Sequence, residues 1–203
     1  MFAELGWTGW LLAGMAVVFV TGGTGFVGSH VVEALVQAGY ETHVIARDSS
    51  RIDGLPNGVV FHRCPIHSPE TMATELGAAD YFVHIAGLTA GSPADMKSIN
   101  GDMVGVWMDA LVRHAPHLQR FVLISSLAAA RPSIAPLCED APSAPVSAYG
   151  HSKRRGEVEA LTRADRLPVT ILRPPAIYGP RDRDIFLYFR FAARGFLPMI
   201  GDP

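Results

Sequence analysis

The chain has 203 residues, of which 49% are hydrophobic and 18% charged, so it is long enough for one α/β domain with a full core and too short for two. Its net charge is −2 and it has no basic run, which argues against a nucleic-acid partner. Cys64 and Cys138 have neither disulfide nor metal spacing, and we expect free thiols in a reducing cytoplasm.

Residues 1–14 come before the first predicted strand. The stretch Leu5 to Val20 is almost uncharged, but it has no basic region, carries an acidic residue and runs into a glycine turn. We therefore predict neither an export signal nor a membrane span. We interpret residues 1–14 as an extension without a role; the alternative is a segment whose Trp7 and Trp10 touch a membrane.

The segment Ala16 to Gly28, AVVFVTGGTGFVG, predicts a buried strand, a tight turn and the start of a helix. The four apolar residues Val17 to Val20 suit a central parallel strand, and helical periodicity follows the turn until Gly39 supplies the expected C-cap. Without a Cβ, the turn lets a pyrophosphate approach backbone N–H groups at the helix N-terminus. We therefore predict a dinucleotide site, the alternative being an ordinary β–α turn. The residues of this predicted phosphate site are Gly22, Gly25, Phe26, Val27 and Gly28.

Glu41 to Ala46 is predicted to form the second strand, whose tip distinguishes the two nicotinamide cofactors. In a dinucleotide fold this tip, about 20 residues past the glycines, meets the adenosine ribose. Arg47, Ser50 and Arg51 suit a 2′-phosphate, so we predict NADP rather than NAD. Asp48 is the counter-evidence, because a carboxylate would bind a free 2′-hydroxyl; a solvated loop is the third interpretation.

Val59 to His62 is predicted to be a short third strand. His62, Cys64 and His67 then suggest part of a zinc site. No second pair of ligands has matching spacing, however, and Pro65 stiffens the segment as a loop. We therefore predict no metal.

Asp80 to Ile85 is predicted to be the fourth strand, and a long helix is predicted from Asp95 to His114. The strand ends in small residues that let a nucleotide lie against it. The cofactor contacts predicted at this strand end are Ile85, Ala86 and Gly87. Most apolar residues of the helix belong to the core, and Asn100 is the polar exception.

Arg120 to Ile124 is predicted to be the fifth strand. Ser125 and Ser126 follow at its carboxyl end, the edge where open parallel sheets bind ligands. A proline-rich loop, Arg131 to Pro145, then crosses the surface. These serines are therefore candidates for contacts with a ligand.

The next helix is predicted from Val146 to Arg163 and contains Tyr149 and Lys153. Residues at i and i+4 share one helix face. A cation beside the phenol lowers its pKa toward the range of a general acid/base. The pair is therefore a candidate catalytic site, although an isolated Tyr-x-x-x-Lys pattern is usually a surface pair.

Val169 to Leu172 is predicted to be the sixth strand, and Pro174-Pro175 begins a rigid loop over the same sheet edge. A helical run from Arg181 toward Arg194 follows. The last twenty residues are densely apolar, and the sheet can cover only one side of them. We expect an exposed apolar surface that leads to a homodimer or to aggregation, the alternative being a tail that folds back on itself.

Four ordered motifs resemble the extended short-chain dehydrogenase/reductases, also described as the NAD-dependent epimerase/dehydratase family. They are TGGTGFVG, the serine pair after the fifth strand, YGHSK and RPPAIYGP. The segment ARDSSR also looks like the strand-two tip of the NADP-using dihydroflavonol-reductase branch. The resemblance implies a Rossmann-type, doubly wound parallel sheet with helices on both faces. It also implies a cofactor domain over residues 15–203, with the substrate-binding lobe starting at about residue 174.

The resemblance also assigns roles to individual residues. In this family a tyrosine is the acid/base, a lysine holds the nicotinamide ribose and lowers the tyrosine pKa, and a serine binds the substrate oxygen. These roles fall on Tyr149, Lys153 and Ser126. Ser125 is the second candidate serine, Asn100 matches the family's helix asparagine, and Pro174-Pro175 matches the loop that meets the nicotinamide carboxamide.

Two departures qualify the resemblance. Pro65 stands where the family usually has an acidic residue that touches adenine. Family members are also longer, so we expect most of the substrate lobe to be missing. Three hypotheses follow: an NADP-dependent oxidoreductase acting on a carbonyl or alcohol, an NAD-dependent nucleotide-sugar epimerase or dehydratase, and a non-catalytic nucleotide-binding subunit.

Overall fold

The computed structural model describes residues 15–47, 50 and 54–196. The strands are β1 (Val17–Thr21), β2 (Glu41–Ala46), β3 (Val60–Arg63), β4 (Tyr81–His84), β5 (Arg120–Ile124) and β6 (Val169–Leu172). The α-helices are α1 (Phe26–Gln37), α2 (Ala73–Leu76), α3 (Pro93–Met96), α4 (Met103–His114), α5 (Ala148–Leu161) and α6 (Ile185–Ala192). Three further turns are η1 (Pro69–Met72) and η3 (Leu127–Ala129), both 3₁₀, and η2 (Lys97–Asp102), a π-helix. The predictions for residues 1–14, Asp48 and Arg51 lie outside the described residues.

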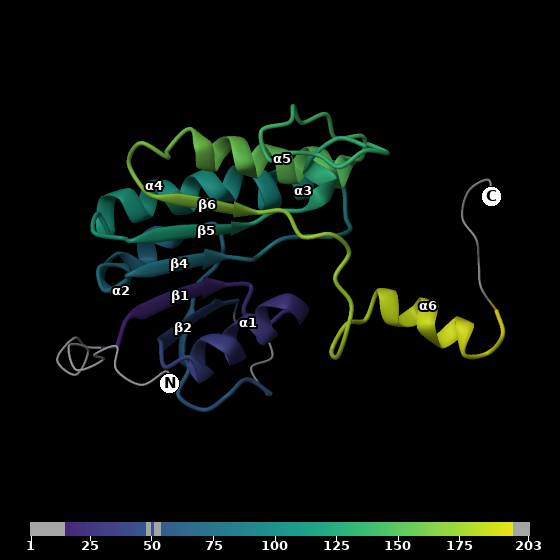
Figure 1. Cartoon of the computed structure of the whole chain (residues 1–203). Helices are drawn as coiled ribbons and strands as arrows, with labels where there is room; N and C mark the ends of the chain where they lie inside the picture. Colours follow the sequence, from purple (N-terminus) through teal and green to yellow (C-terminus); the bar gives the residue numbers. More distant parts are fainter. Residues whose placement is uncertain (1–14, 48–49, 51–53, 197–203) are drawn as a thin grey trace, which may run out of the picture.

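The six strands form one parallel sheet in the order β3-β2-β1-β4-β5-β6. The strand order reverses between β1 and β4, and ligands of such folds bind in the crevice beyond the carboxyl ends at this point. In Figure 1 the arrowheads of β4, β5 and β6 point toward the side on which α6 lies. The order confirms the predicted Rossmann-type, doubly wound sheet.

Alternating residues of β1 enter two different cores. Val18 and Val20 share a buried cluster with Val32 of α1, whereas Phe19 belongs to the cluster that contains Trp107 of α4. Successive side chains of a strand point to opposite faces, so a strand covered on both faces must be apolar throughout. Figure 1 shows α4 and α5 together over the β4–β6 part of the sheet, with α1 beside β1 and β2.

The predicted strands agree closely with those observed. The bounds of β2, β5 and β6 are as predicted. Those of β1 differ by one residue at its C-terminal end, and those of β3 and β4 differ by one residue at both ends. The helix α1 ends as expected at Gly39, which has a φ of 83°. The Tyr40 N–H donates to the Leu35 carbonyl at 3.1 Å and the Gly39 N–H donates to the Val36 carbonyl at 3.0 Å, which completes a Schellman motif.

The helix predicted from Asp95 to His114 is present but not uniform. It begins at Pro93, and the preceding Ser92 Oγ accepts a hydrogen bond from the Asp95 N–H at 3.1 Å. The π-helical turn η2 then separates α3 from α4. A π turn adds one residue and so changes the direction of the side chains that follow it. Asn100 lies in this turn and is buried.

Two short helical segments between β3 and β4 were not predicted. They are η1 and α2, each of four residues. A segment of one turn is too short to show a helical repeat of apolar residues. Leu76 of α2 is nevertheless fully buried in the larger core, so tertiary packing rather than periodicity accounts for this helix.

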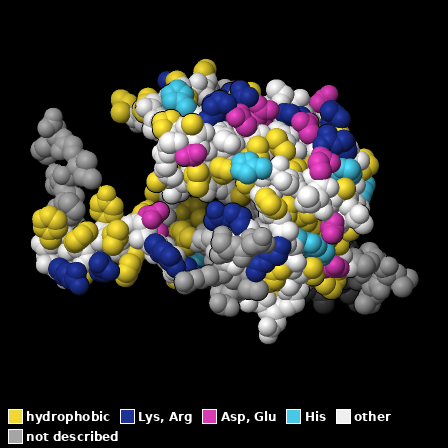
Figure 2. Space-filling model, turned by 180° about the vertical axis from the view of Figure 1, so that it is seen from behind, with side chains coloured by type: hydrophobic (Ala, Val, Ile, Leu, Met, Phe, Trp, Pro, Cys, Tyr) yellow, Lys and Arg dark blue, Asp and Glu magenta, His cyan; other side chains and the backbone are white. Residues whose placement is uncertain are grey.

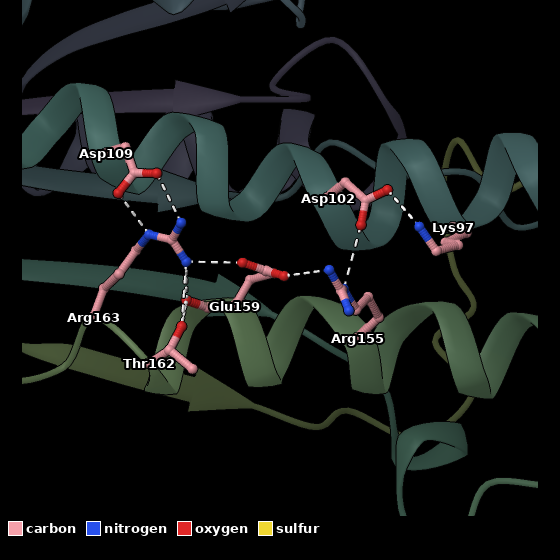
Figure 3. A network of polar contacts seen from close by, with 7 residues as sticks. All are labelled: Lys97, Asp102, Asp109, Arg155, Glu159, Thr162 and Arg163. Atoms are coloured by element: carbon pink, nitrogen blue, oxygen red, sulfur yellow. Dashed lines mark hydrogen bonds and ion pairs between the residues drawn. The ribbon is translucent and has the colours of Figure 1, made fainter.

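The helices α4 and α5 are joined on their outer side by a chain of ion pairs (Figure 3). Arg163 donates to both carboxylate oxygens of Asp109 at 2.7 Å and to Glu159 at 2.8 Å. Arg155 bridges Glu159 at 2.7 Å and Asp102 at 3.3 Å. Partly exposed pairs of this kind contribute little each, so the position of α5 depends mainly on its buried face.

Past β6 the chain leaves the sheet and forms α6 away from it (Figure 1). None of the side chains of α6 is buried, and Phe186 and Phe189 are 51% and 54% exposed. The preceding segment is held to α1, because Arg181 donates to both carboxylate oxygens of Glu33 at 2.8 and 2.6 Å. The helix and its exposed apolar side chains agree with the prediction for residues 185–196. Residues 197–203 lie outside the described residues, and the expected self-association stays a prediction.

Within residues 15–47, 50 and 54–196, no helix has the length and apolar character needed to cross a membrane.

Candidate functional site

A cavity of about 1940 Å³ lies beyond the carboxyl ends of the strands. Figure 2 shows a hollow between the body of the molecule and α6, with hydrophobic side chains inside it and Lys or Arg side chains at its margin. Every predicted site residue that the structure describes lines the cavity: Gly22, Gly25, Phe26, Val27, Gly28, Arg47, Ser50, Ile85, Ala86, Gly87, Asn100, Ser125, Ser126, Tyr149, Lys153, Pro174 and Pro175. The tertiary structure therefore brings together residues that follow five different strands.

The turn after β1 is packed too closely for side chains at two of its glycines. A Cβ added to Gly28 would lie 2.1 Å from the Gly22 carbonyl oxygen, and one added to Gly22 would lie 2.6 Å from the Ala86 nitrogen. The helix α1 begins after Gly25 with no side-chain cap and no acidic residue in its first turn. Its first N–H groups and the positive end of its dipole therefore suit a bound phosphate.

Arg47 and Ser50 line the cavity just past β2. The Arg63 side chain, from β3, donates hydrogen bonds to the carbonyl oxygens of Arg47 at 2.7 Å and of Ser50 at 3.3 Å. The backbone of this tip is thus held by the neighbouring strand, while the Arg47 side chain is exposed. The arrangement leaves a cation at the cavity edge where a fold of this type holds the adenosine ribose.

A buried polar pair below the end of β4 was missed by the sequence analysis. His84 is 1% exposed, and its Nδ1 lies 3.0 Å from Thr21 Oγ1, which accepts a hydrogen bond from the Ala86 N–H at 3.4 Å. Burial lowers the pKa of His84 to about 3, and the charge of Lys153 acts in the same direction. The imidazole is therefore neutral under ordinary conditions, and its Nε2 has no hydrogen-bond partner among the described residues.

The amine of Lys153 is fixed at the end of β5. Ser147 caps α5 by accepting a hydrogen bond from the N–H three residues later at 3.0 Å, and Tyr149 and Lys153 follow one turn apart along the cavity. Lys153 is 6% exposed and its Nζ donates to the Ile124 carbonyl at 2.6 Å. Burial lowers the pKa of Lys153 to about 8, while the negative charge of Glu157 acts in the opposite direction.

The two serines after β5 have different hydrogen bonds. Ser125 is buried, and its Oγ donates to Glu157 Oε1 at 2.6 Å. Ser126 Oγ caps η3 by accepting a hydrogen bond from the Ala128 N–H at 3.2 Å, which leaves its hydroxyl proton for another acceptor. Of the pair, Ser126 is thus the one whose hydroxyl can donate to an oxygen in the cavity.

The side chain of Asn100 is occupied by protein partners. Its Oδ1 accepts from the Leu88 N–H at 2.7 Å, and its Nδ2 donates to the Leu88 carbonyl at 2.8 Å and to Ser152 Oγ at 2.9 Å. Ser152 Oγ in turn donates to the Tyr149 carbonyl at 2.7 Å. Asn100 therefore ties the loop after β4 to the helix that bears Tyr149.

The loop after β6 is joined to the loop after β5. The Leu127 N–H donates to the Pro174 carbonyl at 2.9 Å, and the Ser125 N–H donates to the Leu172 carbonyl at 2.7 Å. These bonds continue the β5–β6 pairing beyond the strands. Pro174-Pro175 and Ser126 therefore keep a fixed relative position at the cavity.

Glu157 is another buried polar residue that the sequence analysis missed. It has no exposed surface, and its carboxylate accepts hydrogen bonds from Ser125, Arg154 and Arg173. Burial alone would raise the pKa of Glu157, but the hydrogen bonds from these three residues lower it below the usual value. The sequence feature that could have indicated its burial is its position one helical turn after Lys153, on a helix whose buried face also contains small residues.

The side chains once considered for zinc have other partners. His62 Nε2 lies 2.9 Å from His43 Nδ1, Cys64 Sγ lies 3.3 Å from the Pro65 carbonyl, and His67 Nδ1 lies 3.0 Å from Met103 Sδ. In the part of the chain that the structure describes, no three His, Cys, Asp or Glu side chains form a group that could hold a metal ion. Cys64 and Cys138 are both free thiols.

The parallel strand order, the close glycine turn and the cavity beyond the strands define a Rossmann-type α/β protein with a nucleotide-binding architecture. The chain belongs to the NAD dependent epimerase/dehydratase family, whose sequence model matches residues 18–196. The extended short-chain resemblance is thereby confirmed.

Individual relatives include both reductases and epimerases. A ceramide reductase of Caulobacter vibrioides is 34% identical over 202 residues, covering 91% of this chain and 54% of that protein. A putative epimerase from Burkholderia cenocepacia has a TM-score of 0.79 at 28% identity, covering 88% of this chain and 60% of the other. A UDP-glucose 4-epimerase from Thermotoga maritima, solved with UDP-glucose, has a TM-score of 0.77 at 25% identity, with 88% and 63% covered. The chain spans about half the length of the curated relatives that it matches.

Proposed function

We propose that this chain is the cofactor domain of an NADP-dependent oxidoreductase that moves hydride between the cofactor and a carbonyl or alcohol carbon, with Tyr149 as acid/base. The observation that carries the proposal is that Ser126, Tyr149 and Lys153 line one cavity with the uncapped N-terminus of α1. The relation to a ceramide reductase and the family match support the reaction type.

The glycine turn fits the cofactor, because Gly22, Gly25 and Gly28 line the cavity at the α1 N-terminus and have no side chain that would keep a phosphate from the backbone. When bound, the nicotinamide supplies or accepts the hydride. Tyr149 donates a proton to the carbonyl oxygen during reduction and takes it back during oxidation. Ser126 donates a hydrogen bond to the same oxygen, and Lys153, held by the Ile124 carbonyl, keeps two N–H donors for the cofactor ribose and the phenol.

Replacement of Tyr149 by phenylalanine tests the catalytic role. Tyr149→Phe keeps the ring but removes the proton, so turnover should fall by about 10²- to 10⁴-fold while the Kd for the cofactor stays nearly unchanged. Steady-state kinetics with a panel of ketones, together with fluorescence titration of the cofactor, measures both. Unchanged turnover would contradict the assignment, and cofactor binding without any turnover would favour the non-catalytic nucleotide-binding subunit.

The preference for NADP is supported by Arg47, which is exposed at the cavity edge beside Ser50. Arg47→Ala should weaken NADPH binding by about 10-fold or more and leave NADH binding almost unaltered, because the lost pair is to the 2′-phosphate. Arg166→Ala, at an exposed arginine outside the cavity lining, is the matched control. Tighter binding of NADH than NADPH by the unaltered protein would contradict the coenzyme assignment.

The cavity wall between β5 and α5 supports an apolar carbonyl substrate. This segment contributes mainly apolar lining residues: Leu127, Ala128, Ala130, Pro132, Ala135, Pro136, Leu137 and Val146. Leu127 and Val146 are 52% and 78% exposed, so their surfaces are available to a ligand. Contact between such a wall and a hydrocarbon removes apolar surface from water and stabilises the complex, whereas contact with a sugar diphosphate gives little stabilisation.

The second candidate is an NAD-dependent nucleotide-sugar epimerase or dehydratase. It is supported by the similarity to the Thermotoga maritima UDP-glucose 4-epimerase and by Arg131 and Arg183, two cavity-lining cations that suit a diphosphate. Such an enzyme oxidises and re-reduces its substrate on one retained cofactor. Mass spectrometry of the purified protein distinguishes the two candidates: copurified NAD favours the epimerase, whereas exchangeable NADP(H) favours the reductase.

A further inference from the structure

Glu157 is a carboxylate buried beside the candidate site but without direct contact with the cavity. Ser125 Oγ donates to its Oε1 at 2.6 Å, and Arg173 Nε donates to the same oxygen at 2.7 Å. Its Oε2 accepts from Arg173 Nη2 at 2.7 Å and from Arg154 Nη1 at 3.0 Å. Both carboxylate oxygens are therefore used, and Arg173 binds in the two-point geometry that fixes direction as well as distance.

Each element of this arrangement stands next to a residue of the proposed site. Ser125 directly precedes Ser126, Arg173 directly precedes Pro174, and Glu157 follows Lys153 by one helical turn. We propose that Glu157 is a positioning residue, whose buried carboxylate holds the ends of β5 and β6 against α5 and so sets the relative positions of Ser126, Pro174 and Lys153. The inference rests on the function proposed above.

The strength of the contact follows from burial. A carboxylate with no exposed surface cannot be solvated by water, so it must keep its hydrogen-bond donors, and loss of a donor leaves an oxygen lone pair buried without a partner. Arg173 also donates to Ser143 Oγ at 3.3 Å, which extends the tie to the loop before α5. The carboxylate therefore joins three segments of the chain through hydrogen bonds.

The same carboxylate acts on Lys153 through its charge. The charged or titratable groups that interact here are Glu157 and Arg154 from α5, His84 from β4 and Arg173 from beyond β6. Tyr149 lines the same cavity as Lys153. His84 is neutral, so Glu157 supplies the negative charge that opposes the effect of burial on the pKa of Lys153. If that charge is removed, two guanidinium groups remain, and the pKa of Lys153 should fall further below about 8.

The sequence allows this effect to be measured without any turnover assay. Lys97 and Lys153 are the two lysines of the chain, so protein labelled with ¹³C-lysine gives two side-chain titration curves. Glu157→Gln keeps the shape of the side chain and removes its charge. We expect the midpoint of Lys153 to move to lower pH by about 0.5 unit or more, while the curve of Lys97 serves as an internal reference.

Glu159→Gln is the matched control, because Glu159 lies on the same helix but pairs with Arg155 and Arg163 on the outer side (Figure 3). It should leave the midpoint of Lys153 unchanged. An unchanged midpoint in Glu157→Gln would overturn the proposal whether or not the chain is an enzyme. Cofactor titration of the same variants then separates this result from the proposed function, because Kd should change less than about threefold.

Arg173→Lys covers the case in which Glu157→Gln fails to fold. This variant keeps the positive charge but loses the two-point contact, so the midpoint of Lys153 should stay while kcat falls by about 10-fold with KM little changed. In the dependence of kcat on pH, the alkaline limb should move in Glu157→Gln and should stay in place in Arg173→Lys. Full kcat in Arg173→Lys would show that the contact does not position the site.

Discussion

The first β–α unit and the segment that ends in α6 are both strongly apolar, yet only the first is buried. Val18, Val20 and Val32 are at most 1% exposed, whereas no side chain of α6 is buried. The strand β1 lies between β2 and β4 and has helices on both faces, while α6 has no covering layer within the described residues. Apolar sequence is thus enough to form secondary structure in both regions, but burial of its side chains needs a partner surface from elsewhere in the fold.

The attachments of the two regions differ in kind. Backbone ladders join β1 to both neighbours, and its side chains fill two cores. The segment before α6 is held mainly by side chains on the surface: Arg181 pairs with Glu33, and His30 Nε2 lies 2.9 Å from the Pro180 carbonyl. Changes in the first region should therefore affect the whole fold, and changes in the second should act locally.

The largest effect is expected from a methyl group in the glycine turn. In Gly28→Ala the Cβ would lie 2.1 Å from a backbone oxygen, so the turn must shift, at a cost of about 1–3 kcal/mol or more. Gly54→Ala is the control, because Gly54 has a φ of 94° but nothing within 4 Å, and it tests backbone strain alone. Urea unfolding measures both variants; an equal or smaller loss in Gly28→Ala would contradict the crowding.

The next effect depends on pH and concerns buried His84. Its pKa of about 3 lies below the ordinary value, so below about pH 6.5 the unfolded chain binds a proton that the folded protein does not. Stability attributable to His84 is therefore lost as pH falls, by about 2 kcal/mol between pH 7.5 and pH 5. His84→Phe and His84→Gln should each flatten the dependence of the unfolding free energy on pH by this amount. A slope equal to that of the unaltered protein would contradict the prediction.

A smaller, local effect is expected where the α6 segment meets α1. Arg181→Ala removes both hydrogen bonds to Glu33, and hydrogen exchange of residues 179–185 should accelerate. Exchange within β1 and the overall melting temperature should stay the same, because the pair lies on the surface. Slower folding or faster exchange in β1 would show that the segment supports the sheet. The exposed Arg166→Ala serves as the control.

The smallest effect on stability is expected for α6 itself. Phe186→Ser with Phe189→Ser should change the unfolding free energy by less than about 0.5 kcal/mol, since neither side chain is buried. The same pair should reduce the self-association that we expect from the exposed apolar surface. Light scattering at micromolar concentration measures the self-association. The prediction would be contradicted if the unaltered protein were monomeric and bound no dye that reports exposed apolar surface.

Much of the fold could be predicted because local patterns are explicit. The short apolar runs gave three strands with their observed bounds, and Gly39 marked the end of α1. The short η1 and α2 were missed because one helical turn shows no repeat. The π-helical turn around Asn100 was missed because it depends on how that residue packs against α5, which no spacing in the sequence reveals.

The candidate site shows the same division. Sequence motifs named Tyr149 and Lys153 and favoured Ser126 over Ser125, because residue type and order within the chain are enough to recognise a family pattern. They did not indicate Glu157, since a glutamate on a helix is usually solvated, and only the fold brings Ser125 and Arg173 to it.

The sequence by itself determined where the six strands, the longer helices and the glycine turn lie, because these depend on periodicity, chain stiffness and steric size over a few residues. The tertiary structure alone decided which polar groups lose water. Burial and partners from distant segments make His84 neutral, lower the pKa of Lys153 and hold Glu157 charged. Those properties depend on distances between elements, which form only when the sheet and its helices pack together.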